Sequence, residues 1–548
     1  KSRIRYYFKP SRINMKSICL LFALTICTLT SYAQEMKRIE IPVAGQLESF
    51  SIPLGEKGLI VLTQLGKSEF NIRKFNTSLE QVWSNQGSVE GNLDYVTNCY
   101  DGKQLYLLFS RFKSNNYYIV RINPTDGKIE KFQIFSVEKM EISNFKALNQ
   151  SLFIGGVINN TPVILFTNLS EKRTRILPAV VNGQAEIQSM DLDTVQQQIN
   201  VVYSVGKKAK NYQLLLKSFD EDGNQLGQIV MNPTEEYAQM NAKSTQLNDS
   251  LQVVVGTYGH KNTIGSSKGP SSQGLYFSAY LDGELQESKF HSFTQFNNFF
   301  NFLGEKQKSK QEKKIKSKEE KGEELRLDYR LLMHEIIKKG DHYIVVAEAF
   351  YPDYKYVNYS PFGGTMGMLG GGLYSPWNML YNPYRWGYGN YGLYSPFSSY
   401  YSPWGYRGYN SYSNSQQFDG WIYTHAIIAE LDEKGNLLWD HSIDLNNIKE
   451  DKLIQKLKTS LHGDVLTLSY QRGNNIISKY ISAQGQSGEE KVQELSRQNE
   501  GDRIRRQEKT DLNYWYSNNF IASGNQTINN SEEGRRSVFF LTKIPLNP

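Results

Sequence analysis

The sequence predicts an all-β protein: a closed β-propeller of eight four-stranded antiparallel blades, with seven blades as the alternative. Three observations lead to this fold class. An apolar strand pair recurs along the chain, glycine-containing turns follow many of the pairs, and helical spacing is nearly confined to 305–337. Many short strands at regular spacing are typical of closed all-β arrays, and repeats long enough for four strands are typical of propeller blades.

The clearest copy of the repeat lies in 343–443. It consists of a strand, Tyr343–Phe350, a second strand, Trp421–Leu431, a turn, Asp432–Asn436, and a third strand, Leu437–Ile443. The turn suits a tight reversal, because Gly tolerates a positive φ and Asp bonds its own backbone. This copy sets the pattern by which the others are recognised.

Weaker copies share an apolar first strand, a polar loop and a second strand rich in Val, Ile, Tyr and Phe. They are 59–65 with 70–75, 105–112 with 117–122, 152–158 with 163–167, 199–205 with 212–219, 251–258 with 275–281, 465–471 with 476–481, and 520–524 with 538–544. Without its two insertions the propeller holds roughly 415 residues, or about 52 for each of eight units, which favours eight blades over seven. Residues 38–43 are well placed to join the last unit and close the ring.

Two of the turns carry a further pattern. Ile122-Asn-Pro-Thr-Asp-Gly-Lys-Ile129 and Leu431-Asp-Glu-Lys-Gly-Asn-Leu-Leu-Trp439 place Asp and Gly between apolar residues. They resemble the blade repeat of quinoprotein-like (PQQ-like) propellers, in which an apolar-Asp-x-x-x-Gly-x-x-x-Trp turn recurs, and the chain as a repeat protein also resembles WD40-like propellers. The resemblance implies a propeller but no particular activity, because the family includes non-catalytic envelope scaffolds as well as dehydrogenases. Trp83 and Trp439, near strand ends, are expected to pack between blades.

Residues 15–33 predict a signal peptide, with a basic start, a short apolar run and a small-x-small cleavage site at Ser31-Tyr-Ala33. Residues 1–14 are expected to precede the natural start. The apolar run, about thirteen residues long, is too short for a membrane span. We therefore expect an exported chain without a transmembrane span, periplasmic, extracellular or associated with the outer membrane, with the propeller over 34–548.

The net charge of +7 depends on this leader. Six of the basic residues and no acidic residue lie within 1–33, so the mature chain carries about +1. This balance gives no basic footprint for nucleic acid, and no nucleic-acid partner is expected. Cys99 is the one cysteine that remains after cleavage, so no intramolecular disulfide is expected.

A charged insertion spans 305–339. Eight Lys and six Glu lie within 305–324, and Leu325–Lys339 continues with further helical spacing. The composition favours a solvated helix or a disordered linker, with a docking helix as the alternative.

An aromatic insertion spans 351–417, with fifteen Tyr, three Trp and four charged residues. Dense Gly and Pro disfavour a regular packed element. One interpretation is a flexible loop without a ligand; the other is an aromatic surface for a protein partner or for sugar rings. The candidate binding residues come from its Tyr-Ser-Pro-aromatic repeats and their surroundings: Tyr374, Trp377, Tyr384, Trp386, Tyr401 and Trp404.

Patterns that suggest chemistry lack their structural context. Gly265-Ser-Ser-Lys-Gly269 fits the nucleophile elbow without a strand before it and a helix after it. Gly387-Tyr-Gly-Asn-Tyr-Gly392 fits a dinucleotide fingerprint without a βαβ unit. The seven His show no metal-ligand spacing. No catalytic residue, metal or cofactor is therefore predicted.

These observations favour a non-catalytic binding or scaffold protein of the cell envelope. We expect it to contact a protein partner through a propeller face and the aromatic insertion. Two alternatives stay open: a polysaccharide-binding protein that uses the insertion, and a propeller hydrolase, lyase or quinone-dependent enzyme with a site on the axis.

Overall fold

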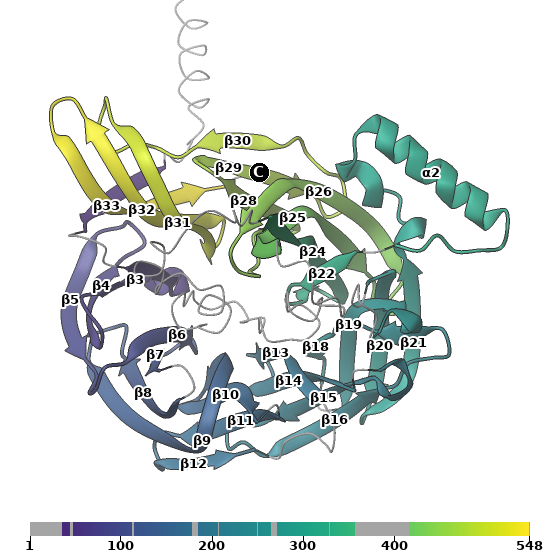
Figure 1. The fold of residues 1–548 in the computed structure, drawn as a ribbon, viewed down its shortest axis with the longest axis horizontal. Coiled ribbons are helices and arrows are strands. Elements are labelled where there is room, and N and C mark those ends of the chain that lie inside the picture. The colour runs from purple at the N-terminus through teal and green to yellow at the C-terminus, as the bar shows by residue number, and fades with distance from the viewer. Residues whose placement is uncertain are drawn as a thin grey trace, which may run out of the picture.

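The computed structural model describes residues 36–43, 48–111, 114–159, 161–177, 185–206, 208–248, 250–264, 271–327, 329–356 and 416–546. These residues are nearly all β, and they contain a single α-helix, α2 (Glu305–Glu319). Small antiparallel sheets stand around a common centre, which is the architecture of a β-propeller (Figure 1).

The first sheets along the chain are given from the inner strand to the outer strand. The β2–β5 sheet consists of β2 (Ser49–Pro53), β3 (Leu59–Gln64), β4 (Glu69–Phe75) and β5 (Gln81–Ser88). The next, of seven strands, consists of β6 (Asp94–Tyr100), β7 (Leu105–Ser110), β8 (Ser114–Ile122), β9 (Ile129–Leu148), β10 (Ser151–Ile158), β11 (Thr161–Asn168) and β12 (Arg173–Ile176). The β13–β16 sheet consists of β13 (Ala185–Asp193), β14 (Gln198–Val205), β15 (Gln213–Phe219) and β16 (Gln225–Met231).

The later sheets follow the same order. The β17–β21 sheet consists of β17 (Tyr237–Gln239) and β18 (Lys243–Gln246), both paired with β19 (Leu251–His260), then β20 (Gly274–Leu281) and β21 (Glu284–Ser292). The β22–β26 sheet consists of β22 (Arg330–Met333) and β23 (Ile337–Lys339), both paired with β24 (His342–Tyr356), then β25 (Gln416–Leu431) and β26 (Leu437–Glu450). The β27–β30 sheet consists of β27 (Lys458–His462), β28 (Val465–Arg472), β29 (Asn475–Ile481) and β30 (Lys491–Glu494). The last sheet consists of β31 (Arg503–Tyr516), β32 (Asn519–Asn530), β33 (Gly534–Pro545) and β1 (Lys37–Pro42).

The long strand β9 belongs to two groups of four strands. Its first part pairs with β8, from Ile129 to Met140, and its last part pairs with β10, from Glu141 to Leu148. The seven-stranded sheet is thus the β6–β9 group and the β9–β12 group, joined by a shared strand.

The core lies between sheets. Buried side chains form eight hydrophobic clusters, and each cluster joins groups of strands that follow one another along the chain or, in one case, the last and the first. That last cluster packs Leu59 against Phe539 and Trp515, and the Trp515 indole donates to the Gly58 carbonyl oxygen at 2.8 Å. Burial of this apolar area supplies the main stabilising free energy of the fold.

Each predicted strand is a strand in the structure, and several are longer than predicted. The predicted joining of 38–43 to the last unit is also observed, since β1 pairs with β33 from Lys37↔Lys543 to Pro42↔Val538. The sequence signal was strongest for the two middle strands of each sheet, where runs such as Leu105–Ser110 are wholly buried. Outer strands such as Arg173–Ile176 are exposed along their length and carry no apolar pattern.

The helical interpretation of the charged insertion is correct only for its first half. Helix α2 ends at Glu319, whereas Arg330–Met333 and Ile337–Lys339 are strands, so a helix or linker over 305–339 is wrong at its end. Leu331, Leu332 and Met333 are buried at the inner edge of the β22–β26 sheet, where pairing with β24 satisfies their backbone. The described residues also contain five short 3₁₀ turns, all of which precede α2: η1 (Gly55–Lys57), η2 (Ala209–Asn211), η3 (Lys261–Thr263), η4 (Phe293–Gln295) and η5 (Phe299–Phe302).

The aromatic insertion begins later and ends earlier than predicted. Strand β24 continues to Tyr356 and β25 begins at Gln416, and these two residues are Cα partners. Residues 357–415 lie outside the described residues, as do the leader segments 1–14 and 15–33. Among the residues that are described, no helix is long and apolar enough to cross a membrane.

Candidate functional site

The candidate binding residues of the aromatic insertion lie outside the described part of the chain: Tyr374, Trp377, Tyr384, Trp386, Tyr401 and Trp404. Their role stays a prediction. The structure does show where the insertion is attached. It joins β24 to β25, and α2 lies in the connection from β21 of the preceding sheet to β22, so both insertions adjoin the β22–β26 sheet (Figure 1).

The attachment of the aromatic insertion is a long ribbon. Strands β24 and β25 are 15 and 16 residues long, and their pairing runs from Tyr343↔Leu431 to Tyr356↔Gln416. Lys449 on β26 binds Asp353 on β24, with Nζ and Oδ2 2.8 Å apart, and also Asp419 on β25. Hydrogen bonds to these two carboxylates raise the pKa of Lys449. The three strands are therefore tied together near the end of the ribbon, close to Tyr356 and Gln416, where the insertion is attached.

The attachment of α2 is a Phe-rich segment, 293–304, which packs on the same sheet. The buried carboxylate of Asp440 accepts from the backbone N–H of Asn297 at 2.9 Å and of Asn298 at 2.7 Å. Burial raises the pKa of Asp440, although these two bonds act in the opposite direction. The segment is thus anchored to β26 by its backbone.

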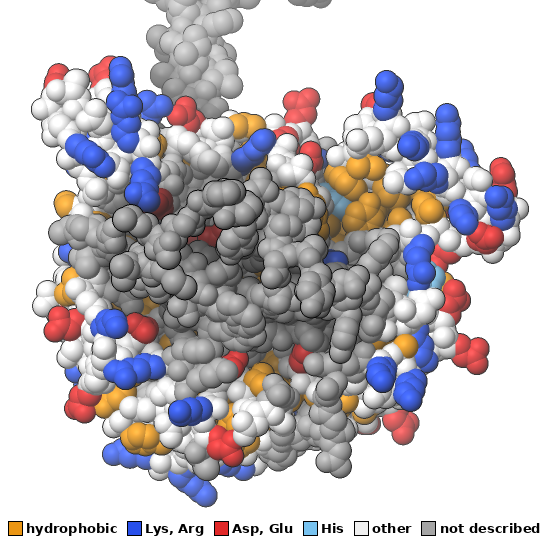
Figure 2. Space-filling model, viewed as in Figure 1, with side chains coloured by type: hydrophobic (Ala, Val, Ile, Leu, Met, Phe, Trp, Pro, Cys, Tyr) orange, Lys and Arg blue, Asp and Glu red, His pale blue; other side chains and the backbone are white. Residues whose placement is uncertain are grey.

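Beyond this anchor, most of α2 is exposed to solvent, and Ile315 is its one buried residue. Seven of its fifteen residues are Lys and three are Glu. Figure 2 shows basic side chains along the helix and hydrophobic side chains gathered beside it. The helix lacks an apolar face of its own and stands at the rim as a basic projection.

The His425 ring is buried under this segment. It stacks on the Phe302 ring with centroids 3.5 Å apart and planes 5° apart, and its edge meets the rings of Phe299 and Tyr329. Burial lowers the pKa of His425 to about 3, so the ring is neutral at ordinary pH. Its position is that of a core residue, because three aromatic rings enclose it.

A lock between neighbouring sheets repeats around the molecule. An outer-strand side chain donates to the carbonyl oxygen of a turn Gly in the next sheet: Asn85 to Gly127 at 2.8 Å, His291 to Gly435 at 2.7 Å and His441 to Gly485 at 2.7 Å. Each of these Gly has a φ of 73°. Two locks include an indole ring, with Trp83 over Gly127 and Trp439 over Gly485. The expected packing of these two Trp between units is thus observed.

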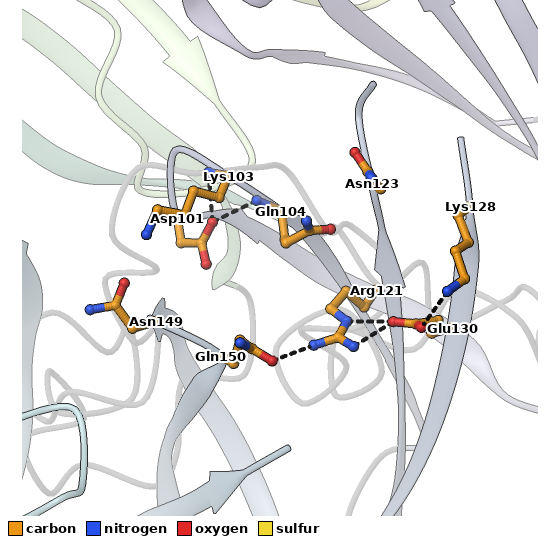
Figure 3. A pocket seen from close by; sticks show the side chains of 9 residues that line it. All are labelled: Asp101, Lys103, Gln104, Arg121, Asn123, Lys128, Glu130, Asn149 and Gln150. Carbon is orange, nitrogen blue, oxygen red and sulfur yellow. Dashed lines mark hydrogen bonds and ion pairs between the residues drawn. The ribbon is translucent and has the colours of Figure 1, made fainter. Parts of the chain in front are cut away.

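A polar pocket of about 590 Å³ lies above β8 and β9, and we name it the Arg121 pocket (Figure 3). Arg121 donates to Glu130 through Nε at 2.8 Å and to Gln150 of the following turn at 2.9 Å. Asp101 accepts from two backbone N–H groups of its own turn, at 2.8 and 2.7 Å. Most polar groups of this pocket therefore already have protein partners.

A second pocket of about 530 Å³ lies at the equivalent place of the β22–β26 sheet, and we name it the Glu430 pocket. The Glu430 carboxylate, 2% exposed, binds Lys339 Nζ at 3.1 Å and His342 Nδ1 at 2.7 Å. Lys339 also donates to the Ala483 carbonyl oxygen of the next sheet at 3.2 Å. The remaining walls come from Asp341, Trp439, Leu438, Asp464 and Gln484.

Ionisable side chains are also buried toward the centre of the molecule, where β24 meets the connection to β27. The Glu348 carboxylate is fully buried and binds His334 Nε2 at 2.8 Å. It also accepts from the backbone N–H of Lys456 at 3.0 Å and of Leu457 at 2.7 Å. Glu348 therefore anchors the connection between two sheets, a structural role.

Three Lys, at positions 452, 456 and 458, lie on or next to the connection from β26 to β27 that Glu348 anchors. Burial of the ammonium group lowers the pKa of Lys452 to about 7, and burial also lowers the pKa of Lys458. The pKa of Lys456 is raised, because the charges of Glu450 and Asp511 outweigh the effect of burial. A Lys with a pKa near neutrality is one mark of a functional site. Within the described ranges, no group of three or more His, Cys, Asp and Glu is placed to hold a metal ion.

The sequence matches no known protein-family profile and no curated protein sequence. Several solved structures share features of the fold at low identity. The β-propeller domain of the Trilobed protease from Pyrococcus furiosus is 7% identical, with 83% of this chain and 99% of that chain covered and a TM-score of 0.33. The Dos1 propeller is 10% identical, with coverage of 83% and 92% and a TM-score of 0.34.

An ACO/RPE65 chimera is 7% identical, with 44% of this chain and 60% of that chain covered and a TM-score of 0.29. This chain therefore spans less than two thirds of the chimera. At such scores, the assignment of the fold rests on the sheets and their pairing.

The sequence alone does not predict the Glu430 pocket, because its walls come from turns and strands that are distant in sequence. One signal was present. The predicted strands Tyr343–Phe350 and Trp421–Leu431 each contain one Glu, Glu348 and Glu430, in an otherwise apolar run. A carboxylate in a buried strand requires a hydrogen-bonding or charged partner. Its position therefore indicates a place where side chains from other elements converge.

Proposed function

We propose that the protein is a closed β-propeller of eight blades that acts as a non-catalytic binding or scaffold protein of the cell envelope. Its partner surface is the β22–β26 sheet, and the partner is a protein. The observation that carries this proposal is that both insertions adjoin one sheet: α2 lies in the connection from β21 that leads into β22, and the aromatic insertion joins the two strands of the β24–β25 ribbon. Exposed additions on a rigid scaffold are typical of binding sites.

The blade count is supported by the packing. The two halves of β9 serve separate four-strand groups, which together with the six other sheets gives eight units. Eight hydrophobic clusters supply the interfaces that a closed ring of eight units requires, including one between the last unit and the first. Neutron or X-ray data at high resolution that place β9 in a single continuous blade would contradict this count.

The location rests on the leader. Cleavage after Ala33 and export of the chain from Gln34 are expected from the signal-peptide pattern in 15–33. N-terminal sequencing of the protein recovered from the periplasm and the medium tests this. Recovery of the intact leader on a cytosolic protein would contradict export.

The partner surface is tested by removing the aromatic insertion. Tyr356 and Gln416 are Cα partners, so a two-residue Asn-Gly turn closes the ribbon in place of 357–415. We expect the deletion variant to keep its circular dichroism spectrum and unfolding midpoint and to lose capture of envelope proteins. A matched variant that replaces the seven Lys of α2 with Gln separates the two insertions. Unchanged capture in both variants would contradict the proposal.

Polysaccharide binding by the insertion is the second candidate, favoured by three Trp and repeated Tyr-Ser-Pro-aromatic units. Pro fixes φ and favours an extended preceding residue, so the sequence predicts that each unit presents two rings reproducibly. Affinity electrophoresis against a panel of polysaccharides tests this, with Trp377, Trp386 and Trp404 changed together to Ala. Retardation that the triple variant abolishes would support a glycan partner, and no retardation on any polymer would remove it.

An enzyme with an axial site is the third candidate, and the lowered pKa of Lys452 favours it. Hydrolysis of a panel of chromogenic esters and glycosides by the purified protein tests it, with Lys452→Met as the control. Turnover that the variant abolishes would replace the binding function with a catalytic one.

A further inference from the structure

We propose that the Glu430 pocket binds a neutral, hydroxyl-rich ligand the size of one or two sugar rings. This site is separate from the aromatic insertion, and it needs no residue of 357–415. Its volume of about 530 Å³ lies within the range of about 300–1,000 Å³ that small-molecule sites occupy.

The floor of the pocket is held rigidly. Glu430 is 2% exposed and Lys339 is 14% exposed, so their ion pair is shielded from water. His342 binds the same carboxylate, and Lys339 reaches across to Ala483 of the next sheet. Two sheets are thereby fixed relative to each other at the pocket, and a preformed site spends little free energy on ordering when a ligand binds.

The rim of the pocket holds unused hydrogen-bonding groups. Asp341, Asp464 and Gln484 line it, and their side chains have no hydrogen-bond partner in the part of the chain that the structure describes. His342 uses only Nδ1 and leaves its other ring nitrogen available. Carboxylates and amides accept from and donate to hydroxyl groups, so this rim suits a polyol.

The walls also offer apolar surface. Leu438 is 47% exposed, and the Trp439 ring lines the pocket beside it. The C–H faces of a sugar ring pack on such surfaces, while its hydroxyl groups face the polar rim. A small inorganic ion would gain no binding free energy from contact with this apolar wall.

The charge of the pocket selects against acidic ligands. Three carboxylates, Asp341, Glu430 and Asp464, stand against the single ammonium group of Lys339. An acidic sugar would meet repulsion from the two rim carboxylates, whereas a neutral sugar would not.

The equivalent Arg121 pocket explains why we assign a ligand to one pocket and not to the other. There Arg121, Glu130 and Gln150 bind one another, and Asp101 serves its own turn. A ligand would have to break these bonds before it could form its own.

The test is isothermal titration of the cleaved protein with methyl glucoside, methyl galactoside, methyl mannoside, N-acetylglucosamine, cellobiose and lactose. Glucuronate and ethanolamine serve as the anionic and cationic probes. We expect saturable binding of at least one neutral sugar, weaker binding of glucuronate, and an affinity loss of at least about tenfold in both Asp464→Asn and Trp439→Leu. Both variants are checked for folding by near-ultraviolet circular dichroism.

Two controls fix the location of the site. Lys103→Ala, at the rim of the Arg121 pocket, should bind the sugar with unchanged affinity. The variant in which Asn-Gly replaces 357–415 should also bind it, which separates this site from the aromatic insertion. No saturable neutral sugar, tighter binding of ethanolamine or glucuronate than of any sugar, or full affinity in Asp464→Asn and Trp439→Leu would overturn the proposal.

Discussion

Two pockets at equivalent places in different sheets differ in how they satisfy their charges. In each, a residue near the end of the third strand faces a residue of the outer strand: Arg121 pairs with Glu130, and Glu430 pairs with Trp439. Arg121 finds its counter-charge directly opposite. Glu430 faces an indole and depends on Lys339, which comes from the end of β23.

The β2–β5 sheet supplies a third case. Lys74 faces Trp83 and donates directly to the Pro124 carbonyl oxygen of the next sheet at 2.6 Å. At this backbone position a cation is satisfied by a carboxylate opposite it or by a carbonyl oxygen of the next sheet, whereas the carboxylate of Glu430 requires a cation from another element. The two pockets differ in a single cross-strand pair, so substitutions at that pair should change the stability of the protein by different amounts in the two pockets.

Removing Glu430 should have the largest effect. Glu430→Leu leaves the Lys339 ammonium group shielded and without its carboxylate, and we expect a loss of about 3 kcal/mol in the free energy of unfolding. Arg121→Met, in a pair that is 19% and 35% exposed, should cost about 1 kcal/mol or less. Urea unfolding followed by circular dichroism measures both.

The double variant Glu430→Leu with Lys339→Met is the control for this difference. It removes the stranded charge and should recover most of the lost stability. Equal losses in Glu430→Leu and Arg121→Met would show that the two pockets are energetically alike.

Histidine separates the two regions further. Four of the seven His, at positions 334, 342, 425 and 441, lie in the β22–β26 region, and none lies in the first 259 residues. The pKa of His425 is lowered to about 3, below its value of about 6.5 in an unfolded chain. Between these two pH values the unfolded chain takes up a proton that the folded protein does not, so stability falls as the pH falls.

This linkage predicts a measurable slope. His425 should contribute up to about 1.4 kcal/mol per pH unit between pH 6.5 and 3, and nothing above that window. In His425→Leu the acid limb of a plot of stability against pH should be shallower by that amount. His462→Gln, at an exposed position, should keep the original slope. Parallel acid limbs for the wild type and His425→Leu would contradict the burial of the ring.

The turn Gly residues test how tightly the indoles are held. A Cβ on Gly485 would lie 2.4 Å from Trp439 Cγ, and the backbone there has a φ of 73°. Gly485→Ala should therefore cost about 2 kcal/mol or more, through strain and displacement of Trp439. Gly534→Ala, with a φ of 77° and open space around it, should cost only about 1 kcal/mol. Similar midpoints of thermal unfolding for both would show that the Trp439 ring moves freely.

Much of this fold was predictable, for a physical reason. Middle strands such as Val465–Arg472 are buried on both faces and therefore read as apolar runs. Outer strands are held by pairing on one side only, so Lys491–Glu494 is wholly exposed and carries no pattern. The apolar residues of segment 330–339 also fit helical spacing, and only the pairing of this segment with β24 shows that it forms strands.

The Glu430 pocket was not predictable in the same way. Periodicity identifies the strand that contains Glu430, but Lys339 comes from the end of β23, and Asp464 and Ala483 line the pocket from the next sheet. Their proximity depends on the register between two sheets, and that information is not local. The turn pattern that ends in Trp439 can be recognised in the sequence. The residue opposite Trp439 is Glu430, whereas the corresponding positions of two earlier sheets carry the cations Lys74 and Arg121. This difference is recognised only when the strand pairing is known.

The smallest expected effect concerns the two indoles themselves. Trp83 Nε1 donates to the Pro124 carbonyl oxygen at 3.3 Å, whereas Trp439 Nε1 is buried and has no hydrogen-bond partner in the described ranges. Trp83→Phe and Trp439→Phe remove the same volume, so the difference between their unfolding free energies isolates the hydrogen bond. We expect Trp83→Phe to be the more destabilising by about 0.5–1 kcal/mol, because Trp439→Phe also relieves a buried donor that lacks an acceptor. Urea midpoints measured in parallel decide this, and a larger loss for Trp439→Phe would mean that its N–H has an acceptor in solution.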